Sequence, residues 1–149
     1  MNNKILEEQD TVKLLKECDA GVKMGVKAID DVMEHVKSKT LNQILIDSKI
    51  EHEKMQKDLN NILDNFNYDG KDPNPIAESM SWMKTNIKLG MDETDNKVAD
   101  IITDGCNMGV KSLNRYLNKY GNADKRAKDI TKRLIDLEKS LQFKMEQYL

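Results

Sequence analysis

The sequence has little of what interrupts a helix. Its 149 residues include only two prolines, together with two phenylalanines and one tryptophan, while Leu, Ile, Lys, Asp, Asn and Met abound. Proline breaks helices because it lacks a backbone N–H and clashes with the preceding turn. The composition therefore favours long, uninterrupted helices and an all-α protein.

An excess of one charge and a long apolar run are also missing. The 24 basic and 26 acidic residues are spread along the whole chain, whereas nucleic-acid and membrane-surface binding need a clustered basic face. No stretch approaches the roughly 20 apolar residues of a membrane span. The start, MNNKILEEQD, carries acids where a signal peptide needs an apolar core. We therefore expect a cytoplasmic protein that binds neither nucleic acid nor membranes.

Several catalytic and redox motifs are absent as well. The sequence has no Gly-rich phosphate loop, no Ser/His/Asp ordering, no Cys-x-x-Cys and no aromatic platform for bases. Cys18 and Cys106 could form a bridge, but two cysteines in such a chain are more typical of reduced, buried residues. The sequence favours a protein that is not an enzyme.

What the sequence does have is apolar residues at helical spacing. Four such series lie in residues 12–36, 41–66, 99–120 and 130–148, and each predicts a helix with one buried face. Only a short joint that contains SKT separates the first two series, and Thr40 followed by Gln43 predicts a capping box at the start of the second helix. Asp92 is the predicted cap of the third helix.

A longer connection is predicted between the second and third helices. The stretch NYDGKDPNP breaks the helix, and Asn74 and Pro75 then indicate the start of a short helix that contains Trp82 and ends at Gly90. A plain up-and-down bundle would not need so long a connection. We interpret residues 67–91 as a crossover.

An internal repeat defines the architecture. The tetrapeptide MGVK occurs at 24–27 and 108–111, and the same shift places Gly21 and Gly25 on Gly105 and Gly109. One further residue of shift aligns IEHEK, from Ile50, with IDLEK. The chain is thus predicted to be one domain, 1–149, with hairpins at 4–66 and 92–148 joined by the crossover, in a ferritin-like four-helix bundle. The glycines favour close helix approach, with room for a ligand as the alternative.

A standard two-metal site is not encoded. Such bundles take a Glu-x-x-His from each of two helices, but this chain has only His35 and His52, and neither follows a Glu at that spacing. The alternative is a reduced pocket for iron, manganese, zinc or a small ligand, with Asp19, Glu51 and His52 as candidate ligands. The simpler interpretation, without a cofactor, makes His52 a hydrogen-bonded core residue.

Other charged and apolar residues have surface interpretations. Glu53 and Glu138 align across the repeat and are expected to be solvated, because glutamate is seldom buried alone. Ile46, Ile50 and Ile135 fall outside the apolar series and predict an exposed patch that joins a homo-oligomer, such as a dimer. Coverage of this patch by the crossover helix is the alternative.

The segment from Ser81 to the end of the third helix resembles the second half of an uncharacterised bacterial ferritin-like family. Trp82, Cys106, Gly109 and Tyr116 match its pattern of a crossover tryptophan, a Cys-Glu-x-Gly-Glu stretch and a later tyrosine. The two glutamates of that stretch are replaced by Asn107 and Val110. The resemblance implies the ferritin-like path and the loss of carboxylates that a metal would use.

Two functions are compatible with these features. The favoured one is a non-catalytic ferritin-like bundle that acts through protein interaction or self-association, as a scaffold related to stress or storage. The alternative is a metal- or small-ligand-binding bundle with a non-standard site at Asp19, Glu51 and His52.

Overall fold

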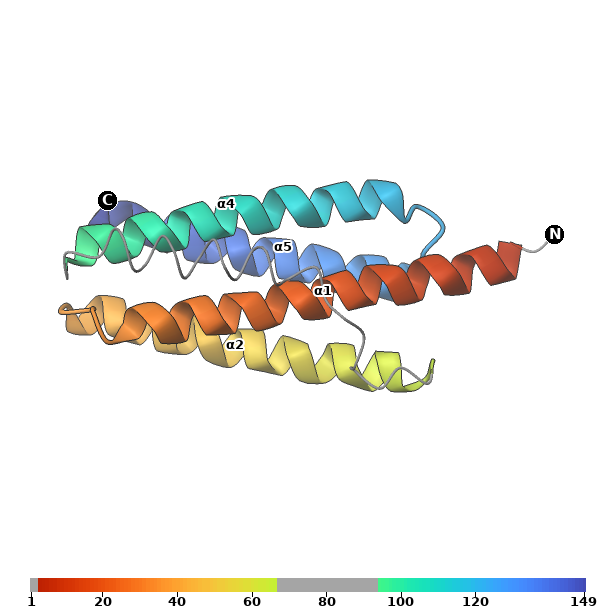
Figure 1. The fold of residues 1–149 in the computed structure, drawn as a ribbon, viewed down its shortest axis with the longest axis horizontal. Coiled ribbons are helices and arrows are strands. Elements are labelled where there is room, and N and C mark those ends of the chain that lie inside the picture. Colours follow the sequence, from red (N-terminus) through yellow and green to blue (C-terminus); the bar gives the residue numbers. More distant parts are fainter. Residues whose placement is uncertain (1–2, 67–93) are drawn as a thin grey trace.

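The computed structural model describes residues 3–66 and 94–149 (Figure 1). Within these ranges the protein is all-helical and has no strand. The elements are α1 (Asn3–Met33), α2 (Lys39–Asp64), α4 (Asp95–Lys119), α5 (Lys125–Met145) and a short 3-10 helix, η1 (Glu146–Tyr148). The prediction of an all-α protein with four long helices is confirmed. The predicted crossover helix with Trp82 lies outside the described residues.

Three of the long helices begin at a side chain that caps the backbone. Ser38 accepts the N–H of Leu41 at 3.2 Å, and Thr94 accepts the N–H of Lys97 at 3.2 Å. Asp124 does the same for Ala127 at 2.8 Å. All three caps have extended backbones, as residues that precede a helix must.

Two of these starts differ from the prediction. The cap of α2 is Ser38 rather than Thr40, which already lies inside the helix. The predicted capping box does not form, because the amide of Gln43 donates to Asp47 at 2.8 Å instead of reaching back. The cap of α4 is Thr94 and not Asp92.

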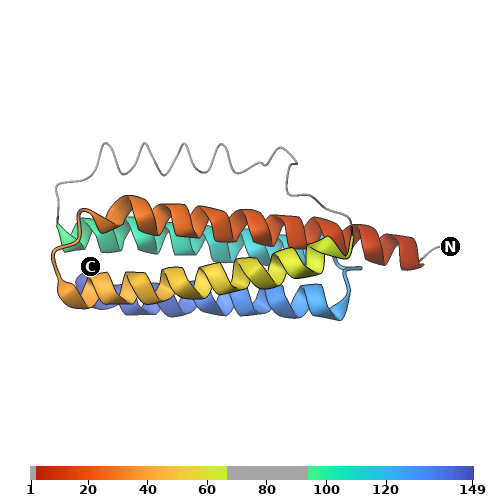
Figure 2. The same ribbon diagram turned by 90° about the horizontal axis from the view of Figure 1, so that it is seen from below.

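The helices form two hairpins, α1–α2 and α4–α5, packed side by side so that α1 lies beside α4 and α2 beside α5 (Figure 2). At one end the N–H groups of Lys37 and Ser38 donate to Asp95 at 2.8 and 3.0 Å. At the other end the N–H of Asp124 donates to Thr11 at 2.8 Å. Helices α2 and α4 therefore start at the same end, and α1 and α5 start together at the opposite end (Figure 1).

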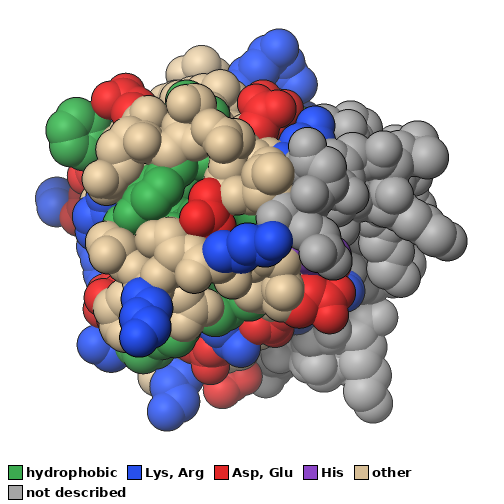
Figure 3. Space-filling model, turned by 90° about the vertical axis from the view of Figure 1, so that its left-hand side faces the viewer, with side chains coloured by type: hydrophobic (Ala, Val, Ile, Leu, Met, Phe, Trp, Pro, Cys, Tyr) green, Lys and Arg blue, Asp and Glu red, His purple; other side chains and the backbone are tan. Residues whose placement is uncertain are grey.

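Charge does not gather on the end of the bundle where α2 and α4 begin. Acidic and basic side chains alternate there over the described surface (Figure 3). This agrees with the nearly equal numbers of the two signs in the sequence.

The apolar core consists of two separate clusters along the bundle axis. One includes Leu15, Val22, Leu59 and Leu134, and the other includes Ile29, Leu45, Ile102 and Leu141. In each helix the residues between the two clusters include glycine or a polar side chain. These are Gly25 in α1, Ser48 and His52 in α2, Gly109 in α4 and Glu138 in α5. We call His52, Glu138, Gly25 and Gly109 the middle layer.

A candidate ligand cavity at the middle layer

His52 is held in one orientation by its own helix. The side chain is fully buried, and its Nδ1 lies 2.7 Å from the backbone carbonyl oxygen of Ser48, one turn earlier in α2. A carbonyl oxygen can only accept, so Nδ1 carries a hydrogen and donates it. The other ring nitrogen, Nε2, is therefore the one that meets the rest of the bundle.

Nε2 meets the carboxylate of Glu138 from the second hairpin, and the distance from Nε2 to Oε1 is 2.5 Å. Because two lone pairs would repel at this distance, a proton must lie between the two atoms. With Nδ1 already protonated, His52 and Glu138 together hold one shared proton and carry no net charge. We call this pair the His–Glu dyad.

The local electrostatics favour this protonated state. Burial opposes a charge on His52, but the hydrogen bond that its Nε2 donates to Glu138 and the negative charge of Glu138 outweigh that effect, so the pKa of His52 lies above its ordinary value. Glu51, on the same helix, adds a smaller effect of the same sign. The raised pKa of His52 therefore acts in the same direction as the geometry, which requires the shared proton.

Both cysteines are buried and free. Burial is the main cause that raises the pKa of Cys106, and its contact with Glu138, to which its thiol is hydrogen-bonded, adds to it. Burial likewise raises the pKa of Cys18 to about 12, and Cys18 is hydrogen-bonded to Thr131 at 3.1 Å. Nucleophilic cysteines need a lowered pKa. These thiols stay protonated and serve as hydrogen-bonding core groups.

Two glycines make room for the dyad. A Cβ placed on Gly25 would lie 2.9 Å from Cδ2 of the His52 ring, closer than real side chains approach. A Cβ on Gly109 would lie 3.5 Å from Oε2 of Glu138, which is ordinary contact. A glycine from each hairpin thus faces the polar side chain of the same hairpin.

The other two glycines of the repeat face open space. A Cβ placed on Gly21 or on Gly105 would have no neighbour within 4 Å among the described residues. Within residues 3–66 and 94–149, no other helix comes close to Gly21 or Gly105, so the predicted close helix approach is not seen there at these two positions. Instead, all four glycines line a cavity of about 120 Å³ between α1 and α4.

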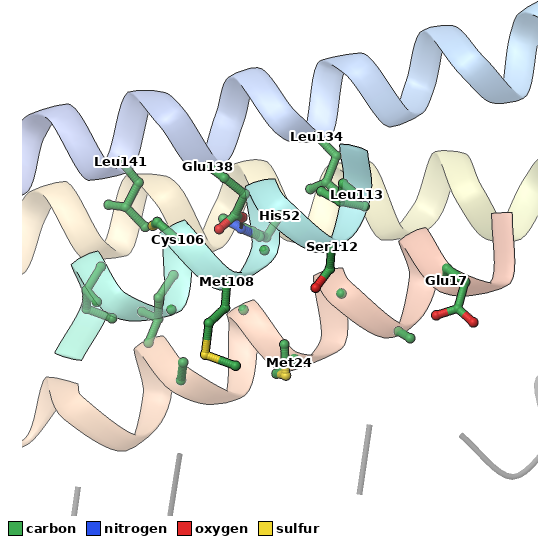
Figure 4. A pocket seen from close by; sticks show the side chains of 18 of the residues that line it. Glu17, Met24, His52, Cys106, Met108, Ser112, Leu113, Leu134, Glu138 and Leu141 are labelled. Atoms are coloured by element: carbon green, nitrogen blue, oxygen red, sulfur yellow. Dashed lines mark hydrogen bonds and ion pairs between the residues drawn. The ribbon is translucent and has the colours of Figure 1, made fainter. Parts of the chain in front are cut away.

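The dyad forms the inner wall of this cavity, as Figure 4 shows. The remaining lining is mainly apolar, and its larger members are Met24, Ile29, Met108, Leu113, Leu134 and Leu141. Glu17, Ser112 and Tyr116 add polar groups on the side of α1 and α4. Burial and a hydrogen bond with Glu17 raise the pKa of Tyr116, so its hydroxyl is neutral and paired.

The three predicted ligand residues do not form one site. Asp19 is buried and pairs with Lys23 at 2.8 Å. Glu51 is exposed and lies 3.3 Å from Lys54. Only His52 lines the cavity. In residues 3–66 and 94–149 no three His, Cys, Asp or Glu side chains are grouped so that they could hold a metal ion.

Glu138 is the site residue that the sequence interpretation missed. It was expected to be solvated like Glu53; Glu53 is exposed, but Glu138 is only 9% exposed. The missed signal is the spacing at which the buried positions of the second helix return in the fourth helix. Six buried residues of α2 recur in α5 86 residues later, the separation of His52 and Glu138. The two series are Leu41, Leu45, Ser48, His52, Met55, Leu59 and Ala127, Thr131, Leu134, Glu138, Leu141, Met145.

The predicted isoleucine patch is also only partly present. Ile50 is 46% exposed and Ile46 is half-buried, but Ile135 is buried in the apolar core. The prediction for Ile135 is wrong because the alignment of Ile50 with Ile135 uses a shift of 85 residues, one less than the 86 that relates the buried positions of α2 and α5. The alignment therefore assigned Ile135 to the outer face of α5.

The chain matches no protein-family model, no curated protein and no solved structure. Among the helices of the described ranges, none combines the length and apolar character that crossing a bilayer requires.

Proposed function

We propose that this protein binds a small, mainly apolar molecule in the cavity at the middle layer. The observation that carries the proposal is the space in front of Gly21 and Gly105, which no packed neighbour in residues 3–66 and 94–149 fills within 4 Å of where a Cβ would lie. Glycine in a helix costs about 1 kcal/mol relative to alanine, and at these two positions alanine would fit without a clash. Within the described part of the chain, the sequence thus has glycine where a larger side chain would fit and would stabilise the helix.

The size of the cavity supports this function. An engineered cavity of about 150 Å³ lined by apolar side chains stays dry and binds benzene. The cavity here, of about 120 Å³, is of the same order and has mainly apolar walls. A molecule of about the size of benzene or slightly smaller is the expected occupant.

The test is to fill the cavity from one side. Gly105→Leu places a leucine side chain in the open space, and Lys111→Leu adds the same side chain on an exposed position of the same helix. Benzene is expected to raise the Tm of the wild type and of Lys111→Leu, because a ligand that binds only the folded state stabilises it. It is expected to leave Gly105→Leu unchanged.

Two results would contradict the proposal. One is that benzene raises no Tm at concentrations up to its solubility. The other is an equal rise in all three proteins, which would place binding outside the cavity.

The ferritin-like path belongs to the same proposal. It is supported by the shared starting end of α2 and α4, which a hairpin pair joined by a crossover requires. It is further supported by the resemblance in the third helix, since Cys106, Gly109 and Tyr116 all line the cavity. In this view the bundle has a ligand cavity at the level where related bundles hold metal.

Self-association is the second candidate function. The observation that favours it is the exposure of large apolar side chains, with Ile50 46% and Phe143 72% exposed. An assembly of this kind predicts a concentration-dependent mass in sedimentation that Phe143→Glu abolishes. A constant monomer mass up to high micromolar concentration would rule it out.

A further inference from the structure

The hydrogen-bonding groups around the cavity restrict the chemistry of its ligand. No lysine or arginine is among the described lining residues. The charged groups are His52 and Glu138, which neutralise each other, and Glu17. An anionic head group would therefore meet no uncompensated positive charge in an apolar environment, where burying a lone charge is costly.

Most hydrogen-bond donors of the cavity are already used. Nδ1 of His52 donates to Ser48, and the proton at Nε2 is shared with Glu138. The thiol of Cys106 is hydrogen-bonded to Glu138, and the hydroxyl of Tyr116 is hydrogen-bonded to Glu17. A ligand that only accepts hydrogen bonds finds few donors left here.

Among the described lining residues the strong acceptors are the carboxylates of Glu17 and Glu138, and Glu138 is the one at the inner wall of the cavity. Oε1 of Glu138 takes the contact with His52, and Oε2 is on the side of Gly109, 3.5 Å from where a Cβ would lie. A carboxylate accepts about four hydrogen bonds, so the bonds with His52 and Cys106 leave Glu138 able to accept another. Gly109 itself lines the cavity. The missing side chain at position 109 therefore leaves Oε2 accessible from the cavity, and Figure 4 shows the Glu138 carboxylate beside His52 at its inner wall.

We infer that the natural ligand is a small apolar molecule with a single hydrogen-bond-donating head, an alcohol or an amine, which donates to Oε2 of Glu138. The apolar part fills the space in front of Gly21 and Gly105. This inference rests on the proposed function, because it names the chemistry of the molecule that the cavity takes up.

Four probes with the same number of heavy atoms separate the possible head groups: cyclopentanol, cyclopentylamine, methylcyclopentane and cyclopropanecarboxylate. Titration calorimetry on the full chain at neutral pH is expected to give a Kd for the alcohol or the amine at least tenfold lower than for methylcyclopentane. The carboxylate is expected not to bind measurably. The tighter of the two donor probes identifies the head group.

Variants of the dyad supply the second readout. Glu138→Ala alone leaves His52 without its partner and can fail to fold, so the test uses the double variant His52→Leu/Glu138→Leu, which removes both partners together. In it the advantage of the donor head is expected to disappear while methylcyclopentane still binds. Glu138→Gln keeps an oxygen acceptor but no charge, and is expected to weaken the amine more than the alcohol.

Three results would overturn the inference, and they differ in what they leave standing. If methylcyclopentane binds as tightly as the donor probes, or the carboxylate binds most tightly, the assigned head group is wrong and the cavity remains a binding site. A donor advantage that persists in the double variant would show that another residue provides it. If no probe and no benzene binds, the proposed function fails too.

Discussion

The two hairpins contribute the same kind of layer to the middle of the bundle, but their glycines stand at different distances from the polar side chain. In the first hairpin a Cβ on Gly25 would be 2.9 Å from the His52 ring; in the second, a Cβ on Gly109 would be 3.5 Å from the Glu138 carboxylate. Gly25 is thus required for the imidazole to fit. Gly109 is not required by packing, and in the inference above its absent side chain leaves Oε2 of Glu138 accessible from the cavity.

The largest expected effect comes from breaking the link between the hairpins. Glu138→Ala is expected to lower the free energy of unfolding by about 3 to 5 kcal/mol, because it leaves the buried His52 without a partner. The double variant His52→Leu/Glu138→Leu is expected to be as stable as the wild type to within about 1 kcal/mol, since both polar groups are replaced by apolar ones. Denaturant unfolding of the two variants measures this.

If the single and double variants lose the same free energy, the dyad is not the coupled unit that its geometry indicates. His52→Leu alone completes the double-mutant cycle and gives the coupling directly.

A smaller effect separates the two glycines. Gly25→Ala is expected to lower the free energy of unfolding by about 1 kcal/mol, because overpacking costs about 1 to 3 kcal/mol and the gain in helix propensity offsets about 1. Gly109→Ala makes only an ordinary contact and is expected to raise it by about 0.5 to 1 kcal/mol. Thermal and denaturant unfolding of both variants checks the contrast.

Gly105→Ala is the matched control, because its Cβ enters open space on the same helix as Gly109. It is expected to show the full gain in helix propensity, about 1 kcal/mol. Equal changes at Gly25 and Gly109 would show that the ring of His52 moves aside freely, and the comparison between the hairpins would then lose its basis.

The smallest effect is a dependence on pH. The pKa of His52 is raised in the folded state, so its contribution to stability is fully present below the unfolded pKa, ordinarily about 6.5. That contribution is lost as the pH rises through the raised folded value. The groups that face His52 are Glu138 from α5, Ser48 and Glu51 from its own helix, and Cys106 through its contact with Glu138.

Unfolding measured from about pH 6 to about pH 9 in the wild type and in His52→Leu/Glu138→Leu isolates this contribution, since other titrating groups are common to both. The wild type is expected to lose stability relative to the double variant as the pH rises. Parallel curves would mean that the proton of the dyad is not linked to folding.

Much of the helical framework could be predicted because it is a local property. The apolar spacing around Leu15, Leu45 and Leu113 repeats within each helix, and these residues are buried as expected. The helix starts were less predictable, because Ser38 and Thr40 both have a capping side chain and only the backbone of the folded chain decides between them. His52 was singled out as a polar residue on a buried face, although its partner was not found.

The sequence by itself determined the four long helices of the described ranges, the pairing of neighbouring helices within each hairpin and the repetition of the glycines, since each follows from spacing along one chain. The partnership of His52 with Glu138 was decided only by the tertiary structure. A shift of one residue turns a helix by about 100°, so the alignment of Glu138 with Glu53 placed its side chain outside, whereas the packed register places it inside, opposite His52. The space in front of Gly21 and Gly105 depends likewise on how α1 and α4 pack across the bundle, which no spacing within one helix can show.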